Sequence, residues 1–305
     1  MDPAARQQAI DLYDRFTHEG MDRRLFIARM VTIAGSVAAA EALIASIAAS
    51  PAAAAITPAD DPRITTALES YGGWDGAGQY HIYVARPRQG GPHPTVMVIH
   101  ENRGLNEHIR DVARRLAVAG MNAVAPDLLT PLGGTPPLDE DKARDLISNV
   151  DLDSTMRDMV GLSKYLSRFY KVNKDLGNGS VGVVGFCWGG AFVNRLAVAA
   201  GDTLDAAVSF YGPAPDPAEA AKVKAPMQFH LAGLDTRVAQ TAWPWISALG
   251  SRGKLVEAFV YPGVNHAFHN DTSAERYDKA AAELAWARTM DFFRRHLGQS
   301  STSAR

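Results

Sequence analysis

From about Asp60 onward, short apolar runs alternate with longer segments in which apolar residues recur at helical spacing. The continuous apolar run at 95–99 is typical of a strand buried on both faces. Further strands are expected at 79–85, 121–125, 181–184, 206–210, 227–231 and 256–261. Helices are expected at 106–119, 153–169, 188–200, 241–249 and 274–297, and a Pro/Gly-rich loop at 130–141. This alternation predicts one α/β domain with a mostly parallel sheet and helices on both faces.

Composition narrows the functional classes. Of the 305 residues, 47 % are hydrophobic and 21 % are charged, which is ordinary for a globular protein. The formal net charge of −2 predicts no strong attraction to nucleic acid or to an anionic membrane. The single cysteine, Cys187, excludes an intramolecular disulfide and a multi-cysteine metal site. His266 and His269 form an H-x-x-H pair, but no carboxylate cluster nearby completes a site, so no bound metal is predicted.

Residues 1–58 differ in character from residues 59–305. The pair Arg23-Arg24 precedes bulky apolar residues and an alanine-rich stretch, a pattern that resembles a twin-arginine (Tat) export signal. Small residues at 53 and 55 fit an A-x-A cleavage site. Such a signal implies recognition by the Tat export machinery and a folded protein in the periplasm, an oxidising compartment that a single cysteine tolerates.

A second interpretation of this segment stays open. Ile10, Leu12, Tyr13 and Phe16 indicate a short amphipathic helix before the arginines. The segment would then be a retained helical extension, docked on the body or on a partner subunit of a cytoplasmic protein. Glu41 interrupts the apolar stretch, which argues against a stable transmembrane helix.

Cys187 follows the apolar run 181–184 within the segment Gly-Phe-Cys-Trp-Gly-Gly (185–190). A strand followed by G-x-C-x-G is the pattern of a nucleophile elbow, with sulfur where serine is usual. Such a turn strains the backbone and leaves no room for side chains at the flanking glycines. The N-terminus of the helix that follows favours a thiolate. We therefore predict that Cys187 is a nucleophile rather than a buried structural cysteine.

A thiol nucleophile needs a base, and the base needs an orienting carboxylate. In α/β-hydrolases the order along the chain is nucleophile, acid, histidine. Asp235 follows an apolar strand and a glycine turn, and His266 follows the next strand in the same way. We predict these two as acid and base. A helix N-cap or turn role is the alternative for Asp235, and His269 is the rival of His266.

Acyl transfer also requires donors for the developing oxyanion. The backbone N–H of Trp188, directly after the nucleophile, is predicted as one donor, and the backbone N–H of Asn102 as the other. Glu101 is unexpected in this loop, since its charge would oppose catalysis unless it is paired or protonated. Arg103 is a candidate partner for Glu101, and His100 is expected to shape the loop.

Five segments together resemble the dienelactone hydrolase family of α/β-hydrolases over about residues 60–297. They are His-Glu-Asn-Arg-Gly-Leu (100–105), Ala-Pro-Asp-Leu (125–128), Gly-Phe-Cys-Trp-Gly-Gly (185–190), Gly-Leu-Asp (233–235) and Asn-His-Ala-Phe (265–268). The resemblance implies an α/β-hydrolase fold and a cofactor-free hydrolase of a small lactone or ester, of carboxymethylenebutenolidase type. It implies a Cys187–Asp235–His266 triad that works through a thioester-type acyl-enzyme. It also implies that Glu101 contacts the thiol at rest and takes its proton when substrate arrives.

One departure from the family pattern concerns how the substrate is bound. Dienelactone-cleaving relatives place an arginine shortly after the catalytic histidine to hold a substrate carboxylate, but residues 268–271 contain none. Arg103, Arg144 and Arg157 are candidate replacements, and Arg103 and Phe268 are predicted to contact the substrate. The alternatives are a general carboxylesterase or thioesterase, or a non-catalytic thiol sensor on the same fold.

The export interpretation makes a direct prediction. The mature chain should begin near Ile56 and should be found in the periplasmic fraction, because the signal is removed after transport. N-terminal sequencing or intact mass of the protein from fractionated cells measures this. Full-length protein found only in the cytosol would contradict it.

Overall fold

The carboxyl ends of the parallel strands lie along the same side of one central sheet. The computed structural model describes residues 1–48, 55–72, 79–137 and 139–298, and in them eight strands form one sheet in the order β1-β2-β4-β3-β5-β6-β7-β8. The strands are β1 (Ile64–Gly72), β2 (Gln79–Pro87), β3 (His93–Ile99), β4 (Asn122–Pro126), β5 (Gly177–Phe186), β6 (Ala206–Phe210), β7 (Met227–Ala232) and β8 (Val256–Tyr261). Strand β2 pairs antiparallel with β1 and β4, and the other neighbours are parallel.

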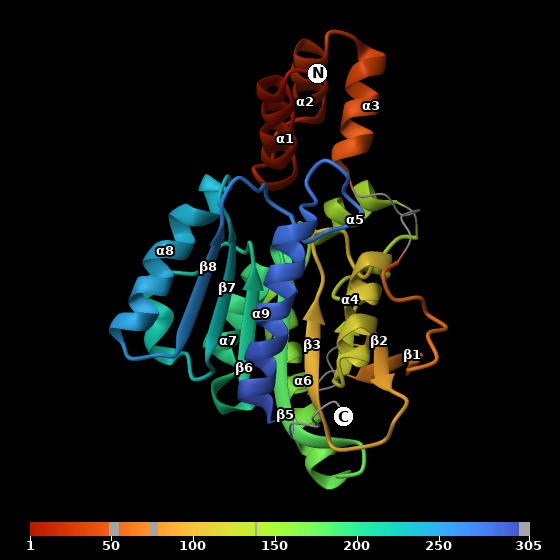
Figure 1. Cartoon of the computed structure of the whole chain (residues 1–305), viewed down its shortest axis with the longest axis vertical. Helices are drawn as coiled ribbons and strands as arrows, with labels where there is room; N and C mark the ends of the chain where they lie inside the picture. Colours follow the sequence, from red (N-terminus) through yellow and green to blue (C-terminus); the bar gives the residue numbers. More distant parts are fainter. Residues whose placement is uncertain (49–54, 73–78, 138, 299–305) are drawn as a thin grey trace.

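Helices cover both faces of the sheet (Figure 1). On one face lie α4 (Glu107–Val118) and α9 (Lys279–Leu297), and on the other lie α6 (Leu152–Val172), α7 (Trp188–Ala199) and α8 (Thr236–Ser251). Successive residues of β3 serve the two cores, since Val96 and Val98 pack in the first and Met97 and Ile99 in the second. Shorter elements are α5 (Glu140–Ile147), η1 (Thr130–Leu132), η2 (Gly201–Thr203) and η3 (Pro217–Lys222). The α/β-hydrolase fold expected from the sequence is confirmed.

Three details differ from the expected elements. Strand β1 was not expected, because it is an edge strand whose side chains are mostly exposed and lack an apolar pattern. The expected loop at 130–141 includes η1 and the start of α5. Helix α8 begins at Thr236, before the expected start, and α9 begins at Lys279, after it. Each starts behind an aspartate whose side chain accepts a backbone N–H, Asp235 in α8 and Asp278 in α9.

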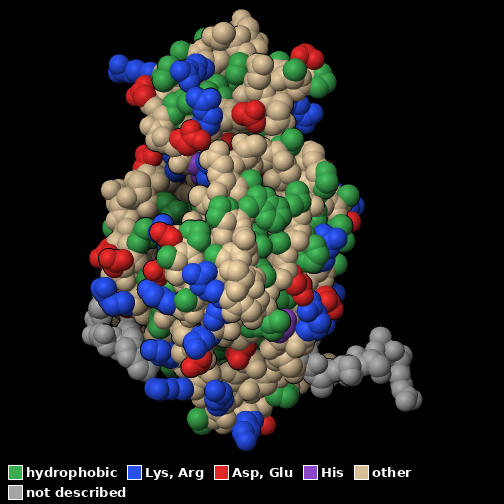
Figure 2. Space-filling model, turned by 90° about the vertical axis from the view of Figure 1, so that its left-hand side faces the viewer, with side chains coloured by type: hydrophobic (Ala, Val, Ile, Leu, Met, Phe, Trp, Pro, Cys, Tyr) green, Lys and Arg blue, Asp and Glu red, His purple; other side chains and the backbone are tan. Residues whose placement is uncertain are grey.

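The first 47 residues form a separate helical lobe, defined here as α1 (Pro3–His18), α2 (Arg23–Ala34) and α3 (Val37–Ile47). The lobe has its own apolar cluster, which includes Ile10, Tyr13, Phe26, Met30 and Leu43. It stands beyond the end of the sheet that carries the loops after β7 and β8 (Figure 1). The space-filling view shows side chains of both charges where the lobe meets the body (Figure 2).

Polar contacts fasten this lobe to the body. The bonded pairs, lobe residue first, are Tyr13 with Arg103 (2.7 Å), Asp14 with Arg276 (3.3 Å), Gln7 with Asn265 (2.6 Å), the Ile47 carbonyl with Ser273 (2.6 Å), and Arg6 with Glu275. Docking on the body is what the retained-extension interpretation expects. The export signal stays a prediction.

None of the described helices is by itself long and apolar enough to cross a membrane. Helices α2 and α3 satisfy the length and composition together, but they are bent by 105° at their junction.

A buried histidine in the core, His230, predicts that the stability of the protein depends on pH. His230 of β7 is fully buried against Tyr261, Gln228 and Thr289, and burial, with the charge of Arg288, lowers its pKa to about 3. The unfolded histidine titrates near 6.5, so between these values only the unfolded chain binds the proton. The free energy of unfolding should therefore fall as pH drops from 6.5 toward 3, by up to about 1.4 kcal/mol per pH unit from this site.

Urea unfolding at several pH values measures this slope. His230→Gln should flatten it, whereas His81→Gln, at an exposed position of β2, should leave it unchanged. Equal slopes in the wild-type protein and His230→Gln would contradict the assignment.

Candidate active site

The turn between β5 and α7 holds Cys187 in a strained conformation. Its backbone lies at φ 55° and ψ −116°, outside the regions that a side chain normally allows. The Cys187 N–H donates to the Phe210 carbonyl (3.0 Å), which ties the turn to β6. A Cβ at Gly185 would overlap the backbone of Gly189, and one at Gly189 would overlap the carbonyls of Ile99 and His100. The glycines on both sides of the predicted elbow are therefore required by close backbone approach.

Asp235 and His266 meet at the same edge of the sheet. Nδ1–H of His266 donates to Oδ2 of Asp235 at 2.5 Å, and both side chains are buried. The other oxygen of Asp235 accepts the Val238 N–H (3.1 Å) and caps α8. The N-cap role weighed from the sequence is thus present together with the orienting contact. Because the Asp235 bond occupies Nδ1, the Nε2 atom of His266 is the one left for a reacting group.

Two imidazoles lie beside the sulfur. Three side-chain atoms that could bind a metal lie within 4.8 Å of one another, one each from Cys187, His266 and His18. The His18 Nε2 is 3.8 Å from Sγ, and the rings of His18 and His266 are 4.8 Å apart. Cys187 and His266 are 4 % and 2 % exposed, so this cluster is largely shielded from water. His18, the last residue of α1, lies within residues 1–58 and was not among the site residues predicted from the sequence.

Electrostatics distinguish the two histidines. Burial acts to lower the pKa of His266, but the charges of Cys187 and Asp235 outweigh it and raise this pKa to about 10. Burial also opposes the charge on Asp235, yet the bonded His266 lowers the pKa of that carboxyl. Burial, with the charge of His266, lowers the pKa of His18 well below its usual value. At neutral pH the resting site therefore holds a protonated His266 and a neutral His18.

Glu101 does not lie in the expected resting contact with the thiol. Its two carboxylate oxygens accept hydrogen bonds from Asn270 (2.7 Å) and from the Tyr211 hydroxyl (3.4 Å). Within the described residues, the hydrogen-bond partner of the sulfur is His18. The Asn270 amide and the Tyr211 hydroxyl thus satisfy both oxygens of this buried side chain, and the guanidinium of Arg276 lies near enough to interact with it.

Other candidates are placed away from the reacting atoms. His269, the rival base, is buried against Phe186 and Phe210, and burial lowers its pKa well below the usual value. Phe268 is fully buried in the core beside Tyr261, so the expectation that it contacts substrate is not met. Arg103 donates to Tyr13 and binds the lobe instead of lining the cavity described below.

The two residues predicted as oxyanion donors come from the start of α7 and from the loop after β3. Trp188 is the first residue of α7, where backbone N–H groups lack partners within the helix, and Asn102 follows the end of β3. Neither amide donates a hydrogen bond within the described residues. His100 accepts from the Leu128 N–H (3.1 Å) and stacks on Trp188, with ring centroids 5.7 Å apart. These contacts fix the loop that carries Asn102.

A cavity of about 580 Å³ opens onto the sulfur between the lobe and the body. Its lobe wall is made by residues at the end of α1 and just after it, Phe16, Thr17, His18, Gly20 and Met21. Its body wall includes Asn102, Cys187 and Trp188 and two cations, Arg144 and Arg237. The sequence had suggested Arg144 but not Arg237. Arg157 is exposed on α6 and does not line the cavity.

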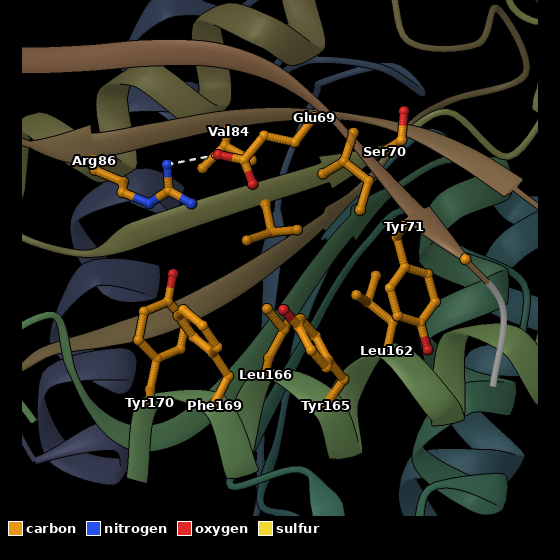
Figure 3. A pocket seen from close by; sticks show the side chains of 13 residues that line it. Glu69, Ser70, Tyr71, Val84, Arg86, Leu162, Tyr165, Leu166, Phe169 and Tyr170 are labelled. Carbon is orange, nitrogen blue, oxygen red and sulfur yellow. Dashed lines mark hydrogen bonds and ion pairs between the residues drawn. The ribbon is translucent and has the colours of Figure 1, made fainter. Parts of the chain in front are cut away.

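A second cavity of about 350 Å³ lies between β1, β2 and α6 (Figure 3). Tyr71, Tyr165 and Phe169 line it, and the ion pair of Arg86 with Glu69 (2.8 Å) closes one side. None of the predicted catalytic side chains lines it, so it is separate from the active-site cavity.

The comparisons with known proteins agree with this arrangement. The profile of the Dienelactone hydrolase family matches residues 81–297. A protein of Escherichia coli O157:H7 named "Putative carboxymethylenebutenolidase" is 32 % identical over 280 residues, covering 83 % of this chain and 96 % of its own length.

Solved structures show the same architecture. The structure titled "Putative Dienelactone Hydrolase from Klebsiella pneumoniae" superposes with a TM-score of 0.66 at 27 % identity, over 75 % of this chain and 98 % of that one. Dienelactone hydrolase from Anabaena variabilis superposes with a TM-score of 0.61 at 21 % identity, over 77 % of this chain and 99 % of that one, and shows the fold alone. The family match spans the elbow, Asp235 and His266, and on this basis the chain belongs to the dienelactone hydrolase family and is a hydrolase of ester or lactone bonds.

Proposed function

We propose that the protein hydrolyses a small lactone or ester through a Cys187–Asp235–His266 triad and an acyl-enzyme. The observation that carries the proposal is the imidazole of His266, held by Asp235 at 2.5 Å next to a sulfur on a strained elbow. A buried structural cysteine does not need a strained turn, and a thiol sensor does not need the Asp235–His266 pair.

In the proposed acylation step, Sγ of Cys187 attacks the carbonyl carbon of the substrate and its proton resides on Nε2 of His266. The N–H groups of Trp188 and Asn102 stabilise the oxyanion. The C–O bond then breaks, and His266 returns the proton to the leaving oxygen. In a lactone the leaving oxygen stays attached as a hydroxyl group of the acyl chain.

In the proposed deacylation step, water attacks the thioester carbon while Nε2 of His266 takes its proton. The C–S bond breaks, the acid is released, the sulfur leaves as a thiolate, and the proton stays on Nε2 of His266, which restores the resting site. Asp235 holds the imidazole in one tautomer through both steps and balances its charge. Glu101 has no proton-transfer role in this scheme, because its oxygens are bonded to Asn270 and Tyr211.

The cavity supports a small acyl substrate that carries negative charge. Arg237 is 4.0 Å from Asp235 and partly exposed, so its guanidinium is available on the side of the cavity next to the acid. The guanidinium of Arg144 lies over the ring of Phe16 in the lobe, 4.4 Å from its centroid. It also forms ion pairs with Asp141 and Asp145. A carboxylate on the substrate would meet these cations in place of the arginine that is absent after His266.

We also propose that the enzyme acts in the periplasm, supported by the twin-arginine pattern at Arg23-Arg24. In that case removal of the lobe would open one wall of the cavity. The docking contacts of the lobe support the alternative, in which the extension is retained in a cytoplasmic enzyme.

Replacing the nucleophile tests the function itself. Cys187→Ala should lower kcat/KM for an aryl ester or a small lactone by at least about 10³-fold, because covalent catalysis is lost. The unfolding temperature should change little, since the side chain becomes smaller at a turn that packing already fixes. Cys187 is the only cysteine, so one equivalent of iodoacetamide should also inactivate the wild-type enzyme. Wild-type turnover in Cys187→Ala would contradict the assignment of Cys187 as the nucleophile.

Replacing the orienting acid tests the triad. Asp235→Asn should lower kcat by about 10³–10⁴-fold, because the amide favours the wrong imidazole tautomer. Asparagine caps helices about as well as aspartate, so α8 should keep its start and the protein its stability. Asp278→Asn makes the same change at the N-cap of α9 and should keep full activity. Similar losses in both variants would show that capping, and not orientation, explains the effect.

A further inference from the structure

We propose that His18, Cys187 and His266 form a zinc site, and that a zinc ion bound there reversibly switches the hydrolase off while the N-terminal lobe is docked. The three side chains come from the end of α1, the elbow after β5 and the loop after β8. Their potential ligand atoms lie within 4.8 Å of one another. The metal-binding part of this proposal stands on the cluster alone, and the inhibition rests on the proposed function.

The donor set has the chemistry that zinc prefers. One thiolate and two imidazoles are borderline-soft ligands, typical of zinc and unlike the oxygen ligands of magnesium or calcium. With Zn–N and Zn–S bonds of about 2.0 to 2.3 Å, tetrahedral ligands lie about 3.6 Å apart. The 3.8 Å between Sγ of Cys187 and Nε2 of His18 is close to this value. All three ligand atoms lie within 4.8 Å of one another, so the side chains would have to move inward to reach tetrahedral spacing.

A second observation points to a ligand at this place. Nε2 of His266 is buried and makes no hydrogen bond of normal length and angle within the described residues, and the neighbour that acts on His266 on this side is the Cys187 sulfur. Its Nδ1 is held by Asp235, and this carboxylate–histidine arrangement orients many zinc ligands. The unpartnered nitrogen lies beside a sulfur and a second imidazole, which is the environment that a metal ion would satisfy.

The fourth ligand position has room. The 580 Å³ cavity reaches both His18 and Cys187, so a water molecule or a substrate oxygen can complete a tetrahedron from that side. A zinc ion in this position would displace the proton from Nε2 of His266 to water and would then bind this nitrogen and the sulfur of Cys187 at once. Attack on a carbonyl carbon would then be blocked until the ion leaves.

His18 makes this site specific to the full chain. A Cys187–His266 pair alone offers zinc two ligands, and His18 supplies the third only while the lobe is docked through contacts such as Tyr13 with Arg103. Loss or displacement of the lobe would therefore weaken zinc binding and release the nucleophile. The hydrolase would be held inactive by zinc in its full-length form.

The test uses the full-length protein, with Zn²⁺ and Co²⁺ as probes. Zinc content after dialysis and competition with a chromophoric chelator give the stoichiometry and the affinity. We expect one zinc per chain, and a sulfur-to-cobalt charge-transfer band on Co²⁺ binding that Cys187→Ser abolishes. His18→Gln should weaken zinc binding by at least tenfold, and His81→Gln, at an exposed histidine of β2, should not.

Inhibition of each variant by zinc is expressed relative to the activity of the same variant without metal. Zinc should inhibit the wild type and His81→Gln at the same concentration, and His18→Gln only at a concentration at least tenfold higher. Wild-type zinc affinity in His18→Gln, or the absence of the cobalt band in the wild type, would overturn the proposal. Metal binding is measured without turnover. The two proposals can fail separately. If the wild-type chain binds zinc but Cys187→Ala keeps its hydrolase activity, the hydrolase mechanism is refuted and the zinc site is retained.

Discussion

The site depends on one sharp reversal of the chain, the turn that places Cys187 between β5 and α7. A non-glycine residue at φ 55° costs of order 1–3 kcal/mol, and the surrounding packing must impose it. The close approach of Gly185 to Gly189, and of Gly189 to the ends of β3, supplies this constraint. The sulfur is thereby fixed above the edge of the sheet where the loops carrying Asp235 and His266 also end. A parallel sheet brings these three residues together although they are far apart in sequence.

The lobe adds a second level to this arrangement. It forms one wall of the cavity and places His18 at the sulfur. Arg103 and Arg276 of the body bond to Tyr13 and Asp14 of the lobe, so groups near the active site also determine where the lobe sits. Access to the nucleophile and the position of the first 47 residues are therefore physically coupled.

The sequence predicted the fold, and it predicted that Cys187, Asp235 and His266 lie close together, because both depend on local patterns. These are apolar runs, glycines around a nucleophile, and acid and base residues at successive strand ends. It missed what tertiary packing decides. His18 meets Cys187 across 169 positions, and no local pattern reports such a contact. The neighbours of Glu101 depend on Asn270 and Tyr211, and Phe268 is buried although it stands two residues after His266. Arg237 was missed because a cation in the first turn of α8 has no motif of its own.

The central claim is that the Cys187 sulfur carries the acyl group between the two half-reactions. The most direct measurement is rapid acid quenching of the full-length enzyme with an aryl ester during the first turnover, followed by digestion and tandem mass spectrometry. The account predicts one acyl group, attached as a thioester to the peptide that contains Cys187. An acyl group on any other side chain, formed at the rate of turnover, would contradict it.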